Sequence, residues 1–497
     1  MFEGVFYFFM NSIISVDQWT LFGLIFVTIF VVLGLAEFIR NYFNKPPEST
    51  RKFVHIFIGL IICFCPLLFK AKYQLITLSS LFIAINTYLL LSKKFKSMNA
   101  TSRKSYGTIY FPFSVLILSI FWWDKPISFI LSILILTLSD PIAAIFGSQQ
   151  SYKFTPWIDK KSIRGSSAMF GSSFLIVLLG TDLLLKFYGS NFSIPIPTLL
   201  GLGIFTALSA TLAESVSCKG SDNLSIPIIT FISYEIYLIN FSHGTLIDLH
   251  IWTALSIIIF SYSYKKKSLS ISGAIGGYIL GIIIFGSGGW NWIIPLILFF
   301  ISSSILSHFN RKEKSQRNLI QILANGGLAT IFAIENIFWG STSSLIFYLG
   351  AISAANADTW GTEIGYQSKS KPKLIFSNQI VSRGTSGSIT LLGTIGSILG
   401  AILIAGLGQT IFDQKNIFIP IAIAGISGSI FDSILGRFFQ AKYYCKVCGD
   451  HTEDTIHCNV PTEMTKGIKV INNNMVNFLN TLFGGIIGYF LWIIINP

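Results

Sequence analysis

The chain has 497 residues, of which 52% are hydrophobic and only 11% are charged, and its formal net charge is +13. Apolar runs of nearly twenty residues recur from end to end, which indicates a polytopic membrane protein and excludes an ordinary water-soluble enzyme. Basic loops at an anionic lipid surface account for the positive charge. We therefore expect the lipid bilayer, and no nucleic acid, as a partner.

A membrane-spanning helix needs about 20 apolar residues, and about 16 segments of the chain meet this requirement. Their centres lie near residues 30, 61, 83, 114, 137, 176, 207, 232, 257, 279, 299, 329, 352, 396, 426 and 486. The sequence therefore predicts an all-α, polytopic transmembrane fold. Residues 1–11 lack the basic start and the small-residue cleavage site of a signal peptide, and we expect them to lie at the membrane interface.

The basic residues indicate how these spans are oriented, because Lys and Arg accumulate in cytoplasmic loops. If the chain starts outside the cytoplasm, the cytoplasmic loops contain 30 of its 35 Lys and Arg residues. The opposite loops contain only Lys70, Lys72, Lys125, Lys186 and Lys415. We predict that both termini are non-cytoplasmic, in what we expect to be the cell membrane.

A run of three lysines, residues 265–267, leaves nine predicted spans before it and seven after it. We interpret this run as a cytoplasmic hinge between two membrane domains, residues 1–265 and residues 268–497.

Acidic residues fall near the cytoplasmic ends of several predicted spans, and such costly groups tend to be functional. They are Asp140, Glu214, Asp358, Glu363 and Asp432. In each half, an acidic span end precedes a basic loop and then a small-residue stretch that we expect to begin a helix, at residues 164–167 and 383–386. Such a helix start can bind phosphate, and opposing carboxylates can hold Mg²⁺. The shared Arg-Gly-Ser/Thr-Ser pattern is short enough to arise by chance.

The sequence lacks the nucleotide-binding motifs known from soluble proteins. No Gly-Lys dipeptide occurs, which excludes a Walker-type phosphate loop, and no kinase-type glycine loop with its catalytic partners is found. Any nucleotide chemistry would therefore use a membrane-specific site.

Five motifs occur in order in the first half of the chain. They are RKFVHIFIG (51–59), RKSYGTIYFP (103–112), SDPIAAIFG (139–147), KKSIRGSSAMF (160–170) and AESVSCKGSDNLSIP (213–227). Together they resemble the CTP-dependent isoprenoid alcohol kinases, the family of dolichol kinase and phytol kinase. They are also distantly similar to the phosphatidate cytidylyltransferases.

The second half contains a different set of motifs. They are SGAIGGYILGIIIFGSGGWNW (272–292), QILANGG (321–327), ANADTWGTEIG (355–365), RGTSGSITLLG (383–393), FDSILGRFFQ (431–440) and NNNMVNFLN (472–480). This half resembles the integral membrane family that includes the plant phytyl-phosphate kinase.

The two resemblances imply consecutive reactions, in which an isoprenoid alcohol such as phytol becomes its monophosphate and then its diphosphate. They imply Mg²⁺ as cofactor and CTP, or another nucleoside triphosphate, as phosphoryl donor. The implied partners are the alcohol, its monophosphate and the nucleotide. Two alternatives are a cytidylyltransferase-like nucleotidyl transfer to a phospholipid and a polytopic transporter with embedded carboxylates.

Two residues of the first half are candidate catalytic residues. Asp140 is suited to a nucleotide or metal role, although an Asp before Pro141 also suits a simple helix cap. His55 shares a helix face with Arg51 and Gly59 and could accept the hydroxyl proton of the alcohol. It is equally suited to ordering the helix bundle by a buried hydrogen bond.

Other residues of the first half are candidates for binding metal or phosphate. Glu214 and Asp222 can ligate Mg²⁺, and Asn223 offers an amide oxygen, although an ordinary polar turn has the same composition. The candidates for binding nucleotide phosphate are Lys160, Lys161 and Ser162, but the two lysines also suit membrane anchoring.

In the second half, the stretch NADTWGTEIG (356–365) places two acids among small polar residues. Gly361 is expected to break the helix so that Asp358 and Glu363 turn toward one site. We predict that Asp358 is catalytic and that Glu363 binds Mg²⁺, whereas the alternative is a capped polar helix end.

Further candidates surround this stretch. Asp432 is a third Mg²⁺ ligand, and Arg383 and Thr385 are phosphate-binding candidates. Asn473 shares a helix face with Asn477, and the pair suits phosphate binding and helix association equally.

Three of the six cysteines, Cys63, Cys65 and Cys218, are expected to be inert. The other three lie close together in the sequence with two histidines, His451 and His457. The candidate ligands for a structural Zn²⁺ are Cys445, Cys448, His457 and Cys458, and the alternative is a plain or redox-active loop.

Overall fold

The computed structural model describes residues 16–92, 105–189, 194–309 and 316–497. Within it the chain forms two compact units, Met1–Gly244 and Thr245–Pro497, which we describe separately. The predicted interfacial segment 1–11 and the basic loop 93–104 lie outside the described residues.

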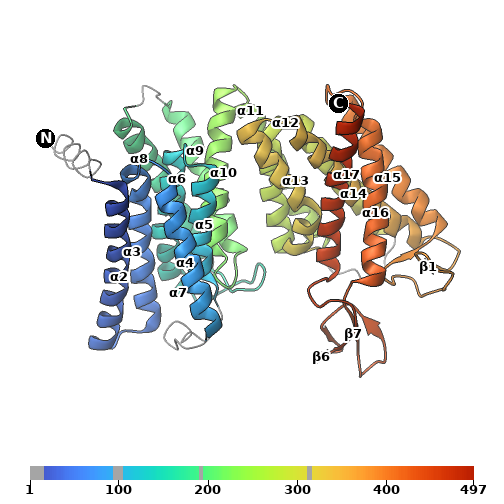
Figure 1. Cartoon of the computed structure of the whole chain (residues 1–497), viewed down its shortest axis with the longest axis horizontal. Helices are drawn as coiled ribbons and strands as arrows, with labels where there is room; N and C mark the ends of the chain where they lie inside the picture. Colours follow the sequence, from blue (N-terminus) through green and yellow to red (C-terminus); the bar gives the residue numbers. More distant parts are fainter. Residues whose placement is uncertain (1–15, 93–104, 190–193, 310–315) are drawn as a thin grey trace. The chain divides into compact units, whose positions relative to one another are not determined.

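The first unit is a bundle of helices (Figure 1). Its helices are α2 (Gln18–Tyr42), α3 (Pro47–Leu68), α4 (Tyr73–Ser92), α5 (Gly107–Phe121), α6 (Pro126–Leu134), α7 (Asp140–Ser148), α8 (Ile163–Phe187), α9 (Ile196–Ser215) and α10 (Asp222–Ser242). Asp17 caps α2, and Pro47, Pro126 and Pro141 occupy the first turns of α3, α6 and α7, where a missing N–H costs nothing. A π-helical turn, η1 (Ile135–Ser139), joins α6 to α7.

The second unit contains α11 (Leu246–Lys265), α12 (Ile271–Phe309), α13 (Leu319–Trp339), α14 (Thr342–Tyr366), α15 (Leu391–Ile411), α16 (Phe418–Phe438) and α17 (Asn473–Ile495). The backbone of α12 breaks at Gly288 and Gly289, where φ and ψ are not helical. α14 lies centrally, since it packs against α12, α13, α15, α16 and α17. Its buried residues surround almost the whole helix from Ser344 to Ala357.

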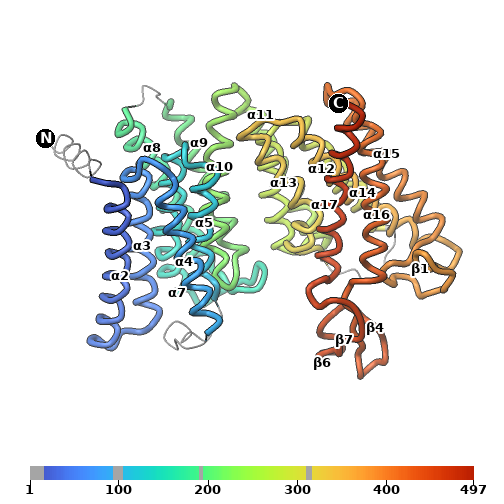
Figure 2. The backbone as a smooth tube through the Cα atoms, in the orientation of Figure 1, coloured from blue at the N-terminus to red at the C-terminus, as the bar shows by residue number. Residues whose placement is uncertain are grey.

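Short strands occur in two segments that connect helices of the second unit. β1 (Lys373–Leu374) pairs with β2 (Ser388–Ile389) between α14 and α15. Between α16 and α17 the strands are β3 (Lys442–Tyr444), β4 (His451–Thr452), β5 (Ile456–His457), β6 (Val460–Pro461) and β7 (Glu463–Lys466). They form a three-stranded sheet, β4-β3-β7, and a hairpin, β5-β6, which project from the ends of these helices (Figure 2).

The predicted all-α transmembrane fold is confirmed. Thirteen helices among the described residues are long and apolar enough to cross a membrane. Every predicted span centre falls within a helix. However, α5 has only 15 residues, α14 is not among the thirteen, and α12 counts once, so the number of 16 spans is not confirmed.

The two units divide after Gly244, whereas the boundary expected from the sequence lies at the other end of α11. α11 packs against α12, with Trp252 stacked on Phe285 and its indole N–H donating to Gly281 O at 3.0 Å. Because such packing leaves no charge signal in the sequence, the lysine run alone did not reveal it.

Candidate functional site

The first unit brings together charged side chains from distant segments of the sequence. Asp140, the first residue of α7, interacts electrostatically with Asp222, Glu214, Lys161 and Arg51. These residues belong to α10, α9, the loop before α8, and α3. Three carboxylates therefore share the site with two cations, and the excess of negative charge favours a bound cation.

Lys161 and Glu214 form a shielded ion pair in this group. Their Nζ and Oε1 atoms are 2.5 Å apart, and their side chains are only 13% and 11% exposed. The backbone of Lys161 exchanges two hydrogen bonds with that of Phe154, at 2.9 and 2.8 Å, which fixes the loop that carries it. The neighbouring Lys160 is exposed, so only one of the two predicted phosphate-binding lysines contacts the acids.

The loop between α9 and α10 is held against the start of α5. Tyr106 N–H donates to Lys219 O at 2.9 Å. Gly220 has a φ of +88°, and a Cβ there would lie 2.5 Å from Gly107 N, so this contact requires glycine. The buried Asn223 side chain also packs on Gly107. The motifs at 103–112 and 213–227 therefore meet in space.

His55 contacts the π-helical turn that precedes Asp140. Its Nε2 lies 3.0 Å from Leu136 O. Because a carbonyl only accepts, Nε2 carries the proton in the neutral ring and Nδ1 remains as the acceptor. One turn further along α3, Gly59 packs so closely on Thr137 that a Cβ would lie 2.2 Å from its Oγ1. No sequence pattern predicted this π-helical turn, a feature common at functional sites.

Side chains already occupy part of the α8 N-terminus, where we expected phosphate to bind. Ser162 Oγ accepts the N–H of Gly165 at 3.1 Å, and Gln150 Oε1 accepts the N–H of Arg164 at 2.9 Å. Ser162 is thus the N-cap of α8. A phosphate would compete with Gln150 for the first turn.

In the second unit, Asp358 and Asp432 occupy matching positions on two parallel helices. α14 and α16 meet at Ala354 and Gly428, where a Cβ on Gly428 would lie 2.6 Å from that of Ala354. One turn later on both helices, Asp358 and Asp432 follow on the same faces. Asp432 accordingly interacts electrostatically with Asp358, and also with Glu453. The structure therefore brings these two predicted residues together.

Asn480 of α17 lies beside Gly428, one helical turn from Asp432, and was not among the candidates expected from the sequence. It is fully buried, and a Cβ on Gly428 would lie 2.6 Å from its Oδ1. Among the described residues, neither amide atom of Asn480 has a hydrogen-bond partner, and neither has Asp432 Oδ2. Buried polar atoms without partners are costly, so these atoms are candidate contacts for a ligand or a water molecule. Asn480 follows Asn473 and Asn477 at helical spacing, and this spacing was the sequence signal that could have identified it. The predicted phosphate ligand Asn473 is itself exposed.

The expected helix break at Gly361 is wrong. α14 runs unbroken from Thr342 to Tyr366. Gly361 instead lets α14 approach α15, because a Cβ would lie 2.1 Å from Ser397 Oγ and 3.3 Å from Gly393 O. Glycine here serves close helix packing, which sequence cannot distinguish from a kink.

As a result, Glu363 does not lie with Asp358. In a continuous helix, five residues correspond to a rotation of about 140°. The buried Glu363 carboxylate accepts the hydroxyl of Ser307 at 2.6 Å, and Ser307 accepts Arg317 at 3.1 Å. Glu363 therefore belongs to a second polar network, with the C-terminal part of α12 and the segment before α13.

Residues 383–386 do not begin a helix, contrary to the expectation. α15 begins at Leu391, and Gly384 and Gly387 have φ values of +86° and +78°, which a right-handed helix cannot contain. Arg383 donates to Ser368 O, and the Thr385 hydroxyl bonds within its own turn. The two predicted phosphate ligands therefore lie in a loop before the helix.

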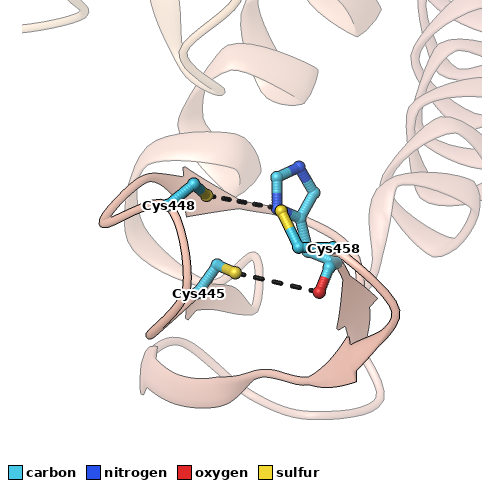
Figure 3. Close-up of side chains that lie close together, drawn as sticks. Cys445, Cys448 and Cys458 are labelled. Atoms are coloured by element: carbon cyan, nitrogen blue, oxygen red, sulfur yellow. Dashed lines mark hydrogen bonds between the residues drawn. The ribbon is translucent and has the colours of Figure 1, made fainter.

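The predicted zinc ligands come together (Figure 3). The ligand atoms of Cys445, Cys448, His457 and Cys458 all lie within 4.8 Å of one another. His457 Nδ1 is 3.4 Å from the sulfurs of both Cys448 and Cys458. A hydrogen bond from the Cys448 backbone N–H, aided by His457, lowers the pKa of Cys445 to about 6. A lowered pKa favours the thiolate, the form of cysteine that binds metal, whereas hydrogen bonds with the neighbouring cysteines raise the pKa of Cys458 to about 11.

The comparisons with known proteins agree with both resemblances. The model of the integral membrane protein family DUF92 matches residues 254–485. The uncharacterized membrane protein MJ0933 of Methanocaldococcus jannaschii is 32% identical, covering 50% of this chain and 96% of that protein. Protein PGR of Arabidopsis thaliana is 29% identical, over 46% of this chain and 90% of that protein.

A phytol kinase of Synechocystis sp. is 27% identical, over 44% of this chain and 91% of that protein. No solved structure gives a significant match. Each of these relatives is matched over nearly its whole length by about half of this chain. The family model covers most of the second unit of this chain, and MJ0933 is 32% identical over almost its whole length. The chain therefore belongs to the integral membrane protein family DUF92.

Proposed function

We propose that the chain is a membrane kinase that converts an isoprenoid alcohol such as phytol to its monophosphate in residues 1–265 and then to its diphosphate in residues 268–497. The observation that carries the proposal is that each unit has its own group of buried or half-buried acids, around Asp140 and around Asp358 with Asp432. The similarity to a phytol kinase supports the chemistry of the first step. Two different acidic sites suit two successive phosphoryl acceptors, the alcohol and its monophosphate.

In the first step, the alcohol oxygen attacks the terminal phosphorus of CTP or another nucleoside triphosphate. An O–P bond forms, the P–O bond to the nucleoside diphosphate breaks, and the hydroxyl proton passes to Nδ1 of His55. Such transfers depend chiefly on positioning and on neutralising phosphate charge. Lys161, oriented by Glu214, and Arg51 supply positive charge beside Asp140.

The donor atoms in both units fit Mg²⁺. Asp140, Glu214 and Asp222 offer carboxylate oxygens in the first unit, as Asp358 and the unpartnered Oδ2 of Asp432 do in the second. Bound Mg²⁺ would neutralise phosphate charge at either site.

In the second step, an oxygen of the monophosphate attacks a second triphosphate, so no hydroxyl proton has to be removed. Asp358 and Asp432 bind the metal nucleotide, and the buried amide of Asn480 binds a phosphate oxygen. Glu363 holds Arg317 through Ser307. From the distribution of basic residues we propose that both sites face the cytoplasm, where nucleotide is available, that both termini lie outside, and that the host membrane is the cell membrane.

The test uses the purified full-length protein in lipid nanodiscs with phytol and either CTP or ATP, and products are identified by mass. We expect Asp140→Asn to make nothing from phytol yet to convert added phytyl monophosphate, whereas Asp358→Asn stops at the monophosphate. Asp182→Asn and Asp413→Asn, exposed acids elsewhere in each unit, are the controls and should perform both steps.

Normal performance of both steps by both site variants would refute the assignment. A product that retains a cytidylyl group would instead identify a nucleotidyltransferase.

A further inference from the structure

The segment between α16 and α17, residues 440–471, which we call the insertion because it separates these two helices, has almost no apolar core. In the described segment 441–470, the only buried apolar residues are Ala441, Tyr443 and Cys445. Apolar side chains such as Val447 and Ile456 are exposed. A segment below about 40 residues usually needs a disulfide or a metal to fold. The few apolar side chains that the insertion buries are too few to stabilise its strands.

Two tight turns direct four ligands toward one point. In the first turn, Gly449 N–H donates to Cys445 O at 2.9 Å, so that Cys445 and Cys448 point the same way (Figure 3). In the second, Cys458 and Asn459 connect β5 to β6 with φ values of +51° and +61°, the conformation of a two-residue type I′ hairpin. This hairpin presents His457 beside Cys458.

The two nitrogen–sulfur separations match those of a tetrahedral zinc site. With Zn–S of about 2.3 Å and Zn–N of about 2.0–2.1 Å, a tetrahedron places ligand nitrogen and sulfur about 3.5 Å apart. The observed Nδ1–Sγ separations are both 3.4 Å. His451, the other histidine of the insertion, is outside the group and packs on Tyr444 instead.

The insertion also joins the ends of the helices that carry Asp432 and Asn480. Ala441 N–H donates to Ile471 O, and Ile468 N–H donates to Phe439 O, both at 2.9 Å. These bonds connect the entry and the exit of the insertion, and so the end of α16 and the start of α17.

The insertion further holds the loop that precedes α15. Glu453 accepts the Ser386 hydroxyl, and Lys442 Nζ donates to Ser386 O at 3.4 Å. A Cβ on Gly387 would lie 2.5 Å from Arg437 N, so this loop also packs on the end of α16.

We propose that Cys445, Cys448, His457 and Cys458 bind one structural Zn²⁺, and that this ion holds α16 and α17 in the register that the Asp358–Asp432–Asn480 site requires. The metal site stands on its own geometry. Its link to catalysis rests on the proposed function of the second unit.

The first experiment measures metal content by mass spectrometry in full-length protein purified under reducing conditions without chelators. We expect about one zinc ion per chain in the wild type and in His451→Ala, the matched control. Cys448→Ser should lose the zinc, whereas His457→Cys should keep it, since four thiolates also form a zinc site. Wild-type protein without zinc, or Cys448→Ser with a full complement, would overturn the proposal, as would a disulfide between Cys448 and Cys458.

A second measurement does not depend on the folding of a variant. Chelation of wild-type protein should open residues 440–471 to limited proteolysis, and added Zn²⁺ should restore protection. Unchanged protection after complete zinc removal would contradict a structural role.

The third experiment tests the link to the second site. In chelated protein we expect phytyl monophosphate conversion to fall at least tenfold while phytol phosphorylation is retained, with recovery on adding Zn²⁺ in the presence of Mg²⁺. A zinc-free protein with a normal second step would refute the link but not the site. If neither step occurs in the zinc-loaded protein, the proposed function fails while the metal result stands.

Discussion

The ion pair between Lys161 and Glu214 gives a prediction that separates structural from catalytic effects. Both side chains are largely shielded, so removing one partner leaves an uncompensated charge in a medium of low dielectric. Breaking such a pair costs about 3–5 kcal/mol. Since each kcal/mol shifts the melting temperature of a unit of this size by about 2–4 °C, Lys161→Met or Glu214→Gln should lower it by about 6–20 °C.

The double variant Lys161→Met, Glu214→Gln removes both charges together. We expect it to recover most of the lost stability, because neither member of the pair is left without its partner. All three variants should lose phytol phosphorylation, since the proposed site requires the charges themselves. Stability and activity would thus separate in the double variant.

The assay follows alkylation of Cys63 and Cys65 with temperature, by mass spectrometry, because both thiols are buried in the first unit. The matched control is Lys186→Met, whose partner Asp182 lies 2.6 Å away but whose ion pair is largely exposed. This change should cost only about 0.3–0.5 kcal/mol. Single variants as stable as this control, or a double variant as labile as the singles, would refute the reasoning.

Three further predictions concern packing and capping. Gly361→Ala should lower the free energy of unfolding by about 1–3 kcal/mol because its methyl group meets Ser397 Oγ, and adding Ser397→Ala should restore stability. The control in the thermal-shift assay is Gly327→Ala, because the nearest neighbour of a Cβ there is 3.9 Å away. Ser162→Ala should lose about 1 kcal/mol of stability with the α8 cap, and an unchanged melting temperature would show that the cap is dispensable. Asn480→Leu should leave stability equal or higher by about 1–3 kcal/mol, because it removes buried polar atoms without partners. The rate of phytyl monophosphate conversion by Asn480→Leu should still fall at least tenfold. Full activity of this variant would exclude a role of Asn480 in binding the phosphate.

The helices could be predicted from the sequence because an apolar run of about 20 residues has few other stable conformations in lipid. Asp140, Glu214 and Asp222 were each expected to have a nucleotide or metal role in the first half, and the structure brings them into one group. The structure adds the partners of these acids. No local pattern identifies Glu214 as the residue paired with Lys161, because they are 53 positions apart in the chain.

The errors in the second half have a common physical origin. Glycine supports a helix break, a left-handed turn and close helix contact, and the sequence does not distinguish them. At Gly361 a break was expected, but the helix continues and separates Glu363 from Asp358. At Gly384 a helix start was expected, but the residue adopts a positive φ in a loop. Asn480 was passed over because its burial depends on Gly428, which lies on a different helix.

The charge balance of the two sites leads to a last prediction. Around Asp140 the acids are accompanied by Arg51 and Lys161, whereas the electrostatic neighbours of Asp432 are themselves acids, Asp358 and Glu453. The second acceptor is also a phosphate, so more negative charge must be neutralised there, by metal rather than by side chains. We therefore expect withdrawal of Mg²⁺ to slow the second step by a larger factor than the first, with the alcohol and its monophosphate assayed separately. If both steps depend equally on Mg²⁺, or if the first step depends on it more, then the side chains of the first site do not take over charge neutralisation from the metal.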